Sequence, residues 1–134
     1  MAQTISVGIK QLIEEGRKEI QEVTADEAME LAKRDDVVIV DIRDVRELWR
    51  EGRIPGTFHV PRGMLEFWID PASPYHKPKF AEDKTFIFHC ASGMRSVLAT
   101  QVAARMGLKP VYNLKGGFGG WKEAGGPVEA VEKK

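Results

Sequence analysis

The sequence predicts a single α/β domain built on a mostly parallel sheet. Segments of strand type alternate with segments of helical periodicity, as in domains whose parallel strands are joined by helices. Residues 37–40 form a continuous Val/Ile run, which is typical of a strand covered on both faces. The length of 134 residues suits one domain. We therefore expect helices on both faces of the sheet and a ligand site at the carboxyl ends of its strands.

The N-terminal residues predict an amphipathic helix. Four apolar side chains recur at helical spacing: Ile5, Ile9, Leu12 and Ile13. All four precede Gly16, and we expect the helix to pack on the domain core, with a partner chain as the alternative surface. On this basis residues 1–19 are an N-terminal extension, residues 20–129 the main domain and residues 130–134 a charged tail. The chain beyond Val128 is expected to fray.

The other elements can be placed in order along the chain. Strands are expected at residues 20–23, 37–40, 58–60, 85–89 and 111–114. Helices are expected after the capping-box sequence at 24–27, at 44–50, at 64–68, between the loop 90–96 and Met106, and at 118–124. The helix before Met106 is expected to bury one stripe: Leu98, Val102 and Met106. Prolines between residues 71 and 78 predict an irregular segment.

Composition argues against several kinds of partner and cofactor. Lys plus Arg and Asp plus Glu both number 20, so no overall field attracts nucleic acid or an anionic membrane. Cys90 is the only cysteine, which excludes an internal disulfide and agrees with a reducing compartment. His59 and His76 lack metal-ligand spacing, so no metal or other cofactor is expected. The N-terminal residues resemble neither a signal nor a membrane span, and a cytoplasmic location is expected.

The loop that follows the strand at 85–89 carries the candidate site. Its residues are Cys90, Ala91, Ser92, Gly93, Met94, Arg95 and Ser96. A cysteine at a strand-to-helix turn faces unpaired backbone N–H groups, which favour its thiolate. Gly93 can adopt a positive φ that curls these groups into an anion-binding nest, and Arg95 adds a fixed charge. The alternative interpretation is a buried structural cysteine.

Three stretches, in order, resemble the signature motifs of the rhodanese family. They are Asp41-Ile42-Arg43 with Glu47 and Gly52–Thr57, the loop Cys90–Ser96, and Leu114–Trp121 with Gly126–Glu129. Over residues 22–129 the chain is therefore similar to a single-domain rhodanese, a thiosulfate or persulfide sulfurtransferase. The resemblance implies a rhodanese-like domain with a mostly parallel five-stranded sheet and helices on both faces.

The resemblance also implies a reaction. Cys90 would take a sulfane sulfur from thiosulfate or a persulfide, keep it as a persulfide, and pass it to cyanide, a thiol or a protein acceptor. Backbone N–H groups from Ala91 to Ser96 would bind the sulfur and the departing anion, and Arg95 would either bind that anion or brace the loop. Ala91 occupies a position that is often basic in members that use thiosulfate well, so one counter-charge for a dianionic donor is missing.

Two other functions remain open. A cysteine phosphatase also uses a Cys-to-Arg loop, but its pattern has one more intervening residue than the four found here, and Asp70 is its only candidate general acid. Alternatively, Cys90 accepts sulfur or an oxidant as a signal in a relay or redox-sensing module. A homodimer through the N-terminal helix is a further expectation.

Charged and titratable residues near the loop are interpreted as structural. Asp41, Arg43 and Glu47 are expected to form ion pairs rather than to perform acid–base chemistry. His89 directly precedes Cys90, but adjacent side chains of a strand point to opposite faces, so its ring is expected not to touch the sulfur.

Overall fold

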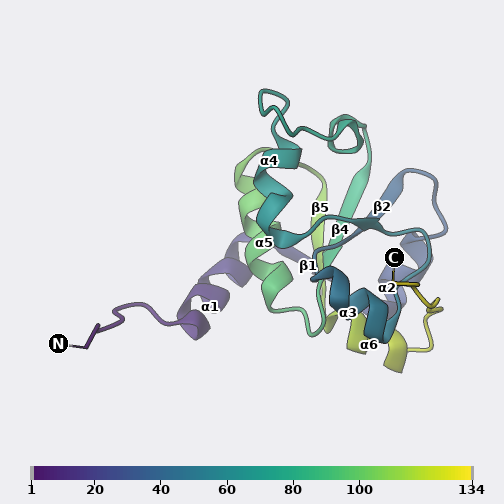
Figure 1. Ribbon diagram of the computed structural model, residues 1–134, viewed down its shortest axis with the longest axis horizontal. Coiled ribbons are helices and arrows are strands. Elements are labelled where there is room, and N and C mark those ends of the chain that lie inside the picture. The colour runs from purple at the N-terminus through teal and green to yellow at the C-terminus, as the bar shows by residue number, and fades with distance from the viewer. Residues whose placement is uncertain (1, 134) are drawn as a thin grey trace.

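The strands of the sheet are parallel to one another. In this computed structural model, which describes residues 2–133, the strands are β1 (Gln21–Val23), β2 (Val37–Asp41), β3 (Phe58–His59), β4 (Thr85–His89) and β5 (Val111–Leu114). Their spatial order is β1-β5-β4-β2-β3, and each neighbouring pair is parallel (Figure 1). The predicted sheet is confirmed. Val60 falls outside β3, although its N–H still donates to the carbonyl of Asp41 at 2.8 Å.

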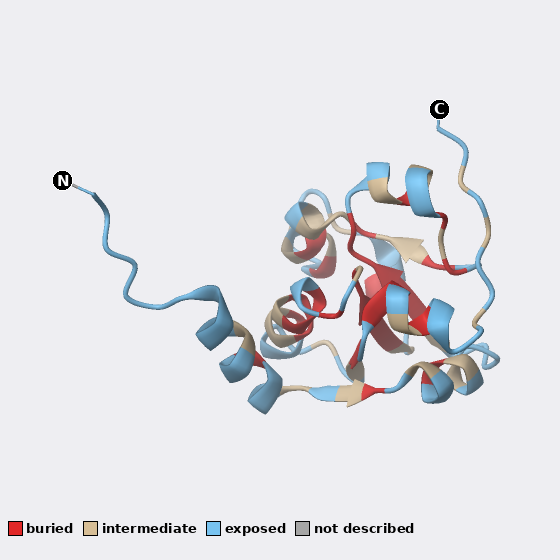
Figure 2. Ribbon diagram, turned by 90° about the horizontal axis from the view of Figure 1, so that it is seen from below, coloured by how far each residue is buried: buried red, intermediate tan, exposed pale blue. Residues whose placement is uncertain are grey.

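Helices cover both faces of the sheet, as predicted. The central strands alternate, so that one face packs against α4 (Leu65–Ile69) and α5 (Arg95–Arg105) and the other against α2 (Ala25–Leu31) and α6 (Gly117–Glu123). The first core includes Val38, Val40, Phe86, Phe88, Leu65 and Ala99. The second core includes Ile39, Ile87, Ala28, Phe118 and Trp121. Figure 2 shows these buried segments at the centre of the domain.

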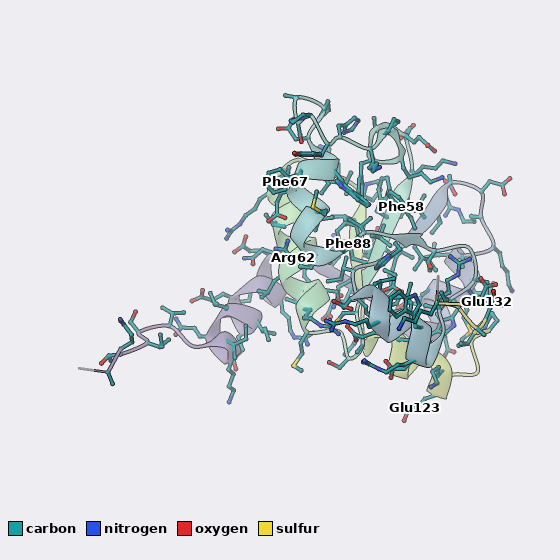
Figure 3. The ribbon with its side chains drawn as sticks, in the orientation of Figure 1. Phe58, Arg62, Phe67, Phe88, Glu123 and Glu132 are labelled. Carbon is teal, nitrogen blue, oxygen red and sulfur yellow. The ribbon has the colours of Figure 1, made fainter. Side chains whose placement is uncertain are left out.

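The short helices begin where their capping residues predict. Thr24 caps α2 and Asp44 caps α3 (Val45–Glu51), and in each case the backbone N–H of the cap residue donates in return to the carboxylate of the glutamate three residues later. Two 3-10 turns, Arg62–Met64 and Pro78–Ala81, flank α4 and the irregular proline segment. In Figure 3, Phe67 lies on the outer side of α4, whereas Phe58 and Phe88 lie nearer the centre of the domain.

Helix α1 (Ile9–Glu19) differs from the prediction in its bounds and in its packing. It begins after Ile5, the first of the predicted apolar residues, and it includes Gly16, which is buried where α1 lies against α5. A Cβ at Gly16 would lie 2.9 Å from Cγ1 of Val97, so the helices approach through a position without a side chain. The prediction that the apolar face packs on the core is wrong for three residues, which are exposed: Ile5, Ile9 and Leu12. Figure 1 shows the chain before α1 extending away from the domain.

The buried face of α5 also differs from the predicted stripe. Met106 is exposed and follows the helix, while Leu98 and Val102 are only half-buried. The buried residues are smaller: Ser96, Val97, Ala99, Thr100 and Ala103. Because α5 contacts the sheet, α1 and α4, small side chains on several sides allow these close approaches.

The C-terminal segment is anchored one residue beyond the point where it was expected to fray. Arg53 and Glu129 exchange two backbone hydrogen bonds of 2.9 Å, and Nε of Arg53 donates to the Glu129 carboxylate at 2.7 Å. The expectation of fraying immediately after Val128 is therefore wrong at Glu129. Arg53 thus fixes this segment through both its backbone and its side chain.

The carboxyl ends of β2, β4 and β5 meet at one edge of the sheet. Asp41 pairs with His89 in the register of β2 and β4, and the loop 90–96 follows β4 between its two neighbours. This is the edge where parallel sheets place their ligand sites. Within residues 2–133, no helix has the length and apolar character needed to cross a membrane.

Candidate active site

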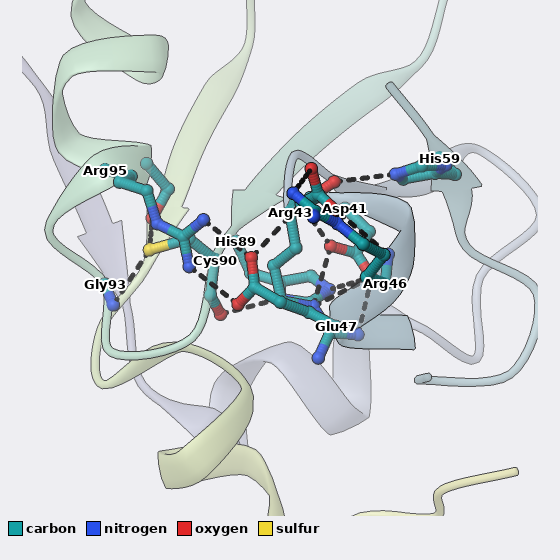
Figure 4. Close-up of polar contacts among 11 residues, drawn as sticks. Asp41, Arg43, Arg46, Glu47, His59, His89, Cys90, Gly93 and Arg95 are labelled. Atoms are coloured by element: carbon teal, nitrogen blue, oxygen red, sulfur yellow. Dashed lines mark hydrogen bonds and ion pairs between the residues drawn. The ribbon is translucent and has the colours of Figure 1, made fainter. Parts of the chain in front are cut away.

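The sulfur of Cys90 is buried inside its own loop. The residue is 1% exposed, and its Sγ accepts a hydrogen bond from the N–H of Gly93 at 3.2 Å (Figure 4). The hydroxyl of Ser96 donates to the same sulfur at 3.4 Å. The loop therefore curls around the thiol and aims donors at it.

These donors favour the thiolate. Burial alone would raise the pKa of the Cys90 thiol, because a buried charge loses its hydration. The hydroxyl and N–H of Ser96 and the N–H groups of Gly93 and Ser92 oppose this, and together they lower the pKa below its ordinary value. The surroundings of Cys90 thus favour the ionised form of its thiol, although the side chain is buried.

Gly93 gives the loop its curl. Its φ is +94°, a conformation that other residues rarely adopt, and a Cβ there would lie 3.0 Å from the N atom of Gly116. The carbonyl of Gly93 accepts a 3.2 Å bond from the Asn113 side chain, whose Nδ2 also donates to Glu22 at 2.9 Å. The loop is therefore tied to β5 and β1. Asn113 was missed by the sequence interpretation, although a polar residue in a buried strand was a signal.

The first turn of α6 braces the other side of the loop. The N–H of Phe118 donates to the carbonyl of Cys90 at 2.8 Å, and that of Gly119 donates to the carbonyl of Ala91 at 3.0 Å. These are N–H groups that have no partner within a helix. The Gly116-Gly117 pair thus contributes to the candidate site by supporting the loop, a role that the motif alone did not indicate.

Arg95 forms a bidentate ion pair with Glu47. Its two terminal nitrogens lie 2.8 and 2.9 Å from the two carboxylate oxygens, which joins the start of α5 to the first turn of α3 (Figure 4). The Glu47 carboxylate raises the pKa of Arg95, while Arg95 lowers that of Glu47. This pair ties the loop to α3, and a role of Arg95 in binding the anion stays a prediction. Glu47 therefore pairs with the loop, not with Asp41 and Arg43.

Asp41 and Arg43 form the predicted structural pair beneath the site. Both are fully buried, with Nη2 of Arg43 2.8 Å from Oδ2 of Asp41. Nδ1 of His89 lies 3.0 Å from the carbonyl oxygen of Cys90, and Nε2 lies 3.6 Å from Oδ2 of Asp41. Burial lowers the pKa of His89, so the ring is neutral near pH 7. As predicted, its polar contacts are with this backbone and carboxylate rather than with the sulfur.

The remaining candidates lie around or away from this centre. Ser92, Met94 and Arg95 face outward, Ala91 is half-buried, and Gly93 and Ser96 are buried. The rings of His59 and His76 bond to the backbone carbonyls of Arg43 and Trp68. Asp70 lines a cavity of about 400 Å³ with Met106 and Leu108, beyond the C-terminal end of α5, whereas Cys90 precedes its N-terminal end. The structure thus separates Asp70 from the thiol.

Comparison with known proteins agrees with this site. The sequence matches the Rhodanese-like domain family over residues 24–124. The chain belongs to this family. Thiosulfate sulfurtransferase GlpE from Glaesserella parasuis is 31% identical over 108 residues, covering 81% of this chain and 92% of the relative. The dual specificity phosphatase Cdc25 from Arabidopsis thaliana is 28% identical over 123 residues, covering 83% and 79%.

Solved structures show the same fold. A protein of unknown function from Rhodopseudomonas palustris, described as a possible tyrosine phosphatase, is 57% identical, with a TM-score of 0.93 over 96% of this chain and 99% of that one. Thiosulfate sulfurtransferase from Pseudomonas aeruginosa is 29% identical, with a TM-score of 0.74 over 92% of this chain but 22% of that longer one. Membership of this rhodanese-like family and the GlpE relatives support a function of the sulfurtransferase kind.

Proposed function

We propose that the chain is a sulfurtransferase that carries a sulfane sulfur on Cys90. One observation carries the proposal: the loop directs two hydrogen bonds at the sulfur, and its donors lower the pKa of a thiol that burial would otherwise keep protonated. An ionised thiol is the nucleophile that such a transfer needs. The similarity to thiosulfate sulfurtransferases supports the same reaction class.

The transfer takes place in two steps. The Cys90 thiolate attacks the outer sulfur of thiosulfate, the bond between the two donor sulfurs breaks, and sulfite leaves with the electron pair. With a thiol persulfide as donor, the leaving group is the thiolate instead. An acceptor such as cyanide then attacks the outer sulfur of the Cys90 persulfide, and the thiolate is restored. Both steps are displacements at sulfur, so no external oxidant or reductant is consumed.

The loop supplies the electrostatic stabilisation. The N–H groups of Ala91, Ser92, Gly93, Met94, Arg95 and Ser96 are the proposed donors to the bound sulfur and to the departing anion. The Ser96 hydroxyl, which already donates to the thiol sulfur, is an additional donor. With one cysteine in the chain, the persulfide must be discharged to another molecule, either a small thiol or a protein acceptor.

Thiocyanate formation tests the proposal. The protein is incubated with cyanide and either thiosulfate or a low-molecular-weight persulfide, and Cys90→Ser is the matched control because the hydroxyl preserves the side-chain shape. Turnover that is lost in Cys90→Ser is the expected result. Equal turnover of both proteins would refute a persulfide on Cys90.

Phosphatase activity is the second candidate, because the 57% identical structure is described as that of a possible tyrosine phosphatase. This candidate lacks a suitably placed general acid, because Asp70 lies beyond the end of α5 that is far from Cys90. An aryl phosphate offered to the same preparation separates the two activities. Hydrolysis that depends on Cys90 and exceeds the rate of sulfur transfer would favour the phosphatase.

A relay or sensing role would use the same persulfide but a protein receiver. Rapid turnover with small thiols favours the enzyme, whereas loading without turnover favours the relay.

We also propose residues 1–19 as an extension that contributes a homodimer contact, since Ile5, Ile9 and Leu12 of this segment are exposed. If deletion of this segment changes neither the oligomeric state nor the stability, the dimer proposal is wrong.

A further inference from the structure

Arg95 is the one cationic residue in the loop from Cys90 to Ser96, and its charge is already paired. Both terminal nitrogens of its guanidinium donate to Glu47. Two parallel charge-assisted bonds are the strongest geometry available between these groups. An anionic donor that approaches Cys90 therefore meets a guanidinium whose charge is offset by a carboxylate, with two of its five N–H groups already donating to Glu47.

Glu47 is fixed more firmly than its partner. Its side chain is 15% exposed, whereas that of Arg95 is 47% exposed. Its Oε1 also accepts the N–H of Asp44 at 3.2 Å as part of the cap of α3. The carboxylate is thus held from two sides, and its lowered pKa keeps it ionised at neutral pH. It is a permanent competitor for the donors of Arg95.

Arg43 and Arg46, which follow β2, do not replace the lost charge. The guanidinium of Arg43 is buried against Asp41, and Arg46 bonds to Asp44 with Nε at 2.9 Å. Each of these cations has its own carboxylate partner. The N–H groups of the loop and the Ser96 hydroxyl remain as neutral donors, and they suit a small sulfur anion better than a dianion.

We infer that Glu47 sets the donor specificity of the site by occupying Arg95, so that persulfides of small thiols are preferred to thiosulfate. The inference rests on the proposed sulfur transfer through Cys90. A persulfide releases a thiolate with one negative charge, whereas thiosulfate releases sulfite with two, and only the second leaving group needs a free guanidinium. Glu47 is a positioning residue here, because it acts on the donor through Arg95.

The test compares Glu47→Gln with the wild type for both donors. Glutamine keeps the size of the side chain and can still accept the Asp44 N–H, so α3 keeps its cap. Release of Arg95 should lower the KM for thiosulfate about five- to tenfold, the effect of one added charge-assisted bond, with kcat changed less than about twofold. The KM for a persulfide should change less than about twofold.

The matched control is an ion pair at the other end of α5, the helix that Arg95 begins. Glu19 forms a bidentate pair with Arg105 of α5 at 3.0 and 2.8 Å, so Glu19→Gln removes an equivalent pair far from Cys90. It should leave both KM values unchanged. In an Arg95→Gln background, Glu47→Gln should no longer affect thiosulfate, because the cation that it releases is absent.

Two results would overturn the inference separately from the proposed function. If Glu47→Gln raises the thiosulfate KM or shifts both donors equally, Glu47 merely orients the loop. If it still lowers the thiosulfate KM without Arg95, the carboxylate acts by direct repulsion instead. If neither donor loads Cys90 of the wild type, the proposed function itself fails, and the specificity inference fails with it.

Discussion

Gly117 lies against the backbone of Cys90 with no room for a side chain between them. A Cβ on Gly117 would lie 2.7 Å from the carbonyl oxygen of Cys90 and 2.8 Å from the carbonyl carbon of Ala91. That proximity allows the next residue, Phe118, to donate its N–H to Cys90 at 2.8 Å. The geometry of the reactive loop thus depends on a glycine that follows β5.

Gly117→Ala should therefore damage both stability and loading of the thiol. The new methyl group would have to displace backbone, and the φ of +59° is itself unfavourable for alanine, so a loss of about 2 kcal/mol or more is expected. Gly119→Ala, in the same helix, is the control, because its Cβ would meet the carbonyl of Ala91 at an ordinary 3.6 Å. Urea unfolding and the rate of persulfide formation measure the two effects. Equal stability and equal loading rates of the two variants would contradict the support of the loop by the start of α6.

The strands and most helices could be predicted because their signals are local. The Val/Ile run at 37–40 and the capping boxes at Thr24 and Asp44 need only neighbouring residues to be interpreted. Three further features depend on contacts between distant segments: the continuation of α1 through Gly16, the anchoring of Glu129 by Arg53, and the pairing of Glu47 with Arg95. Periodicity carries no information about them.

The candidate site divides in the same way. The cysteine, the glycine of the nest and the loop arginine could be identified from one short stretch and its resemblance to a family. The residues that support this stretch could not be identified from the sequence. Asn113 and Gly117 approach the loop only through the pairing of β5 with β4. Arg95 could not be assigned to a role from the sequence, since its partner lies 48 residues away.

Ser96→Ala should make the thiol less acidic. Removing the hydroxyl removes one of the bonds that lower the pKa of Cys90, so the pKa should rise toward its ordinary value. Since the reactive form is the thiolate, the rate of persulfide formation falls as pH falls through this pKa, and the midpoint should move to higher pH. Thiolate absorbance and rates measured against pH both report it. Thr100→Val removes a buried hydroxyl one turn later without touching the sulfur and should leave the midpoint in place.

Gly16→Ala should destabilise the protein although it lies in a helix. In an exposed helix this substitution stabilises by up to about 1 kcal/mol. Here the added methyl group would lie 2.9 Å from Cγ1 of buried Val97, so a net loss of about 1–2 kcal/mol is expected. Gly63→Ala, with nothing within 4 Å of its Cβ, should change the stability little. A gain in melting temperature for Gly16→Ala would show that α1 does not pack on α5 in solution.

Truncation should locate the C-terminal limit of the folded domain between Glu129 and residue 130. Removal of 130–134 leaves the backbone pairing of Arg53 with Glu129 intact, so the free energy of unfolding should stay within about 0.5 kcal/mol. Removal of 128–134 takes away both backbone bonds and the ion pair, and it should cost more than the shorter truncation. Chemical denaturation of the two proteins tests this. Identical midpoints would contradict a structural role for Glu129.

Asp41→Asn should be among the more damaging single changes at this edge of the sheet. It leaves the Arg43 charge buried without its carboxylate, a loss of about 3–5 kcal/mol. Asp44→Asn changes an exposed pair and keeps an N-cap residue, so it should cost far less.

The Asp41–Arg43 pair should also make the stability of the protein depend on pH in the acid range. Burial alone would raise the pKa of Asp41, but the hydrogen bonds and charge of Arg43, together with the charge of protonated His89, outweigh it and leave the pKa lowered. This carboxyl therefore stabilises the fold fully above its unfolded pKa of about 3.9, and the contribution is lost as pH falls through the lower folded value. Denaturation curves of Asp41→Asn should show a flatter dependence on acid pH than those of the wild type, and parallel curves would contradict the assignment.

The central claim is that Cys90 carries the transferred sulfur, and intact mass measures it most directly. The reduced protein is exposed briefly to thiosulfate or to a small-thiol persulfide, desalted and weighed, with Cys90→Ser treated in parallel. The account predicts a gain of one sulfur, about 32 Da, on the wild type alone, removed by cyanide and acquired faster from the persulfide. No gain from either donor on a folded protein with a free thiol would contradict it.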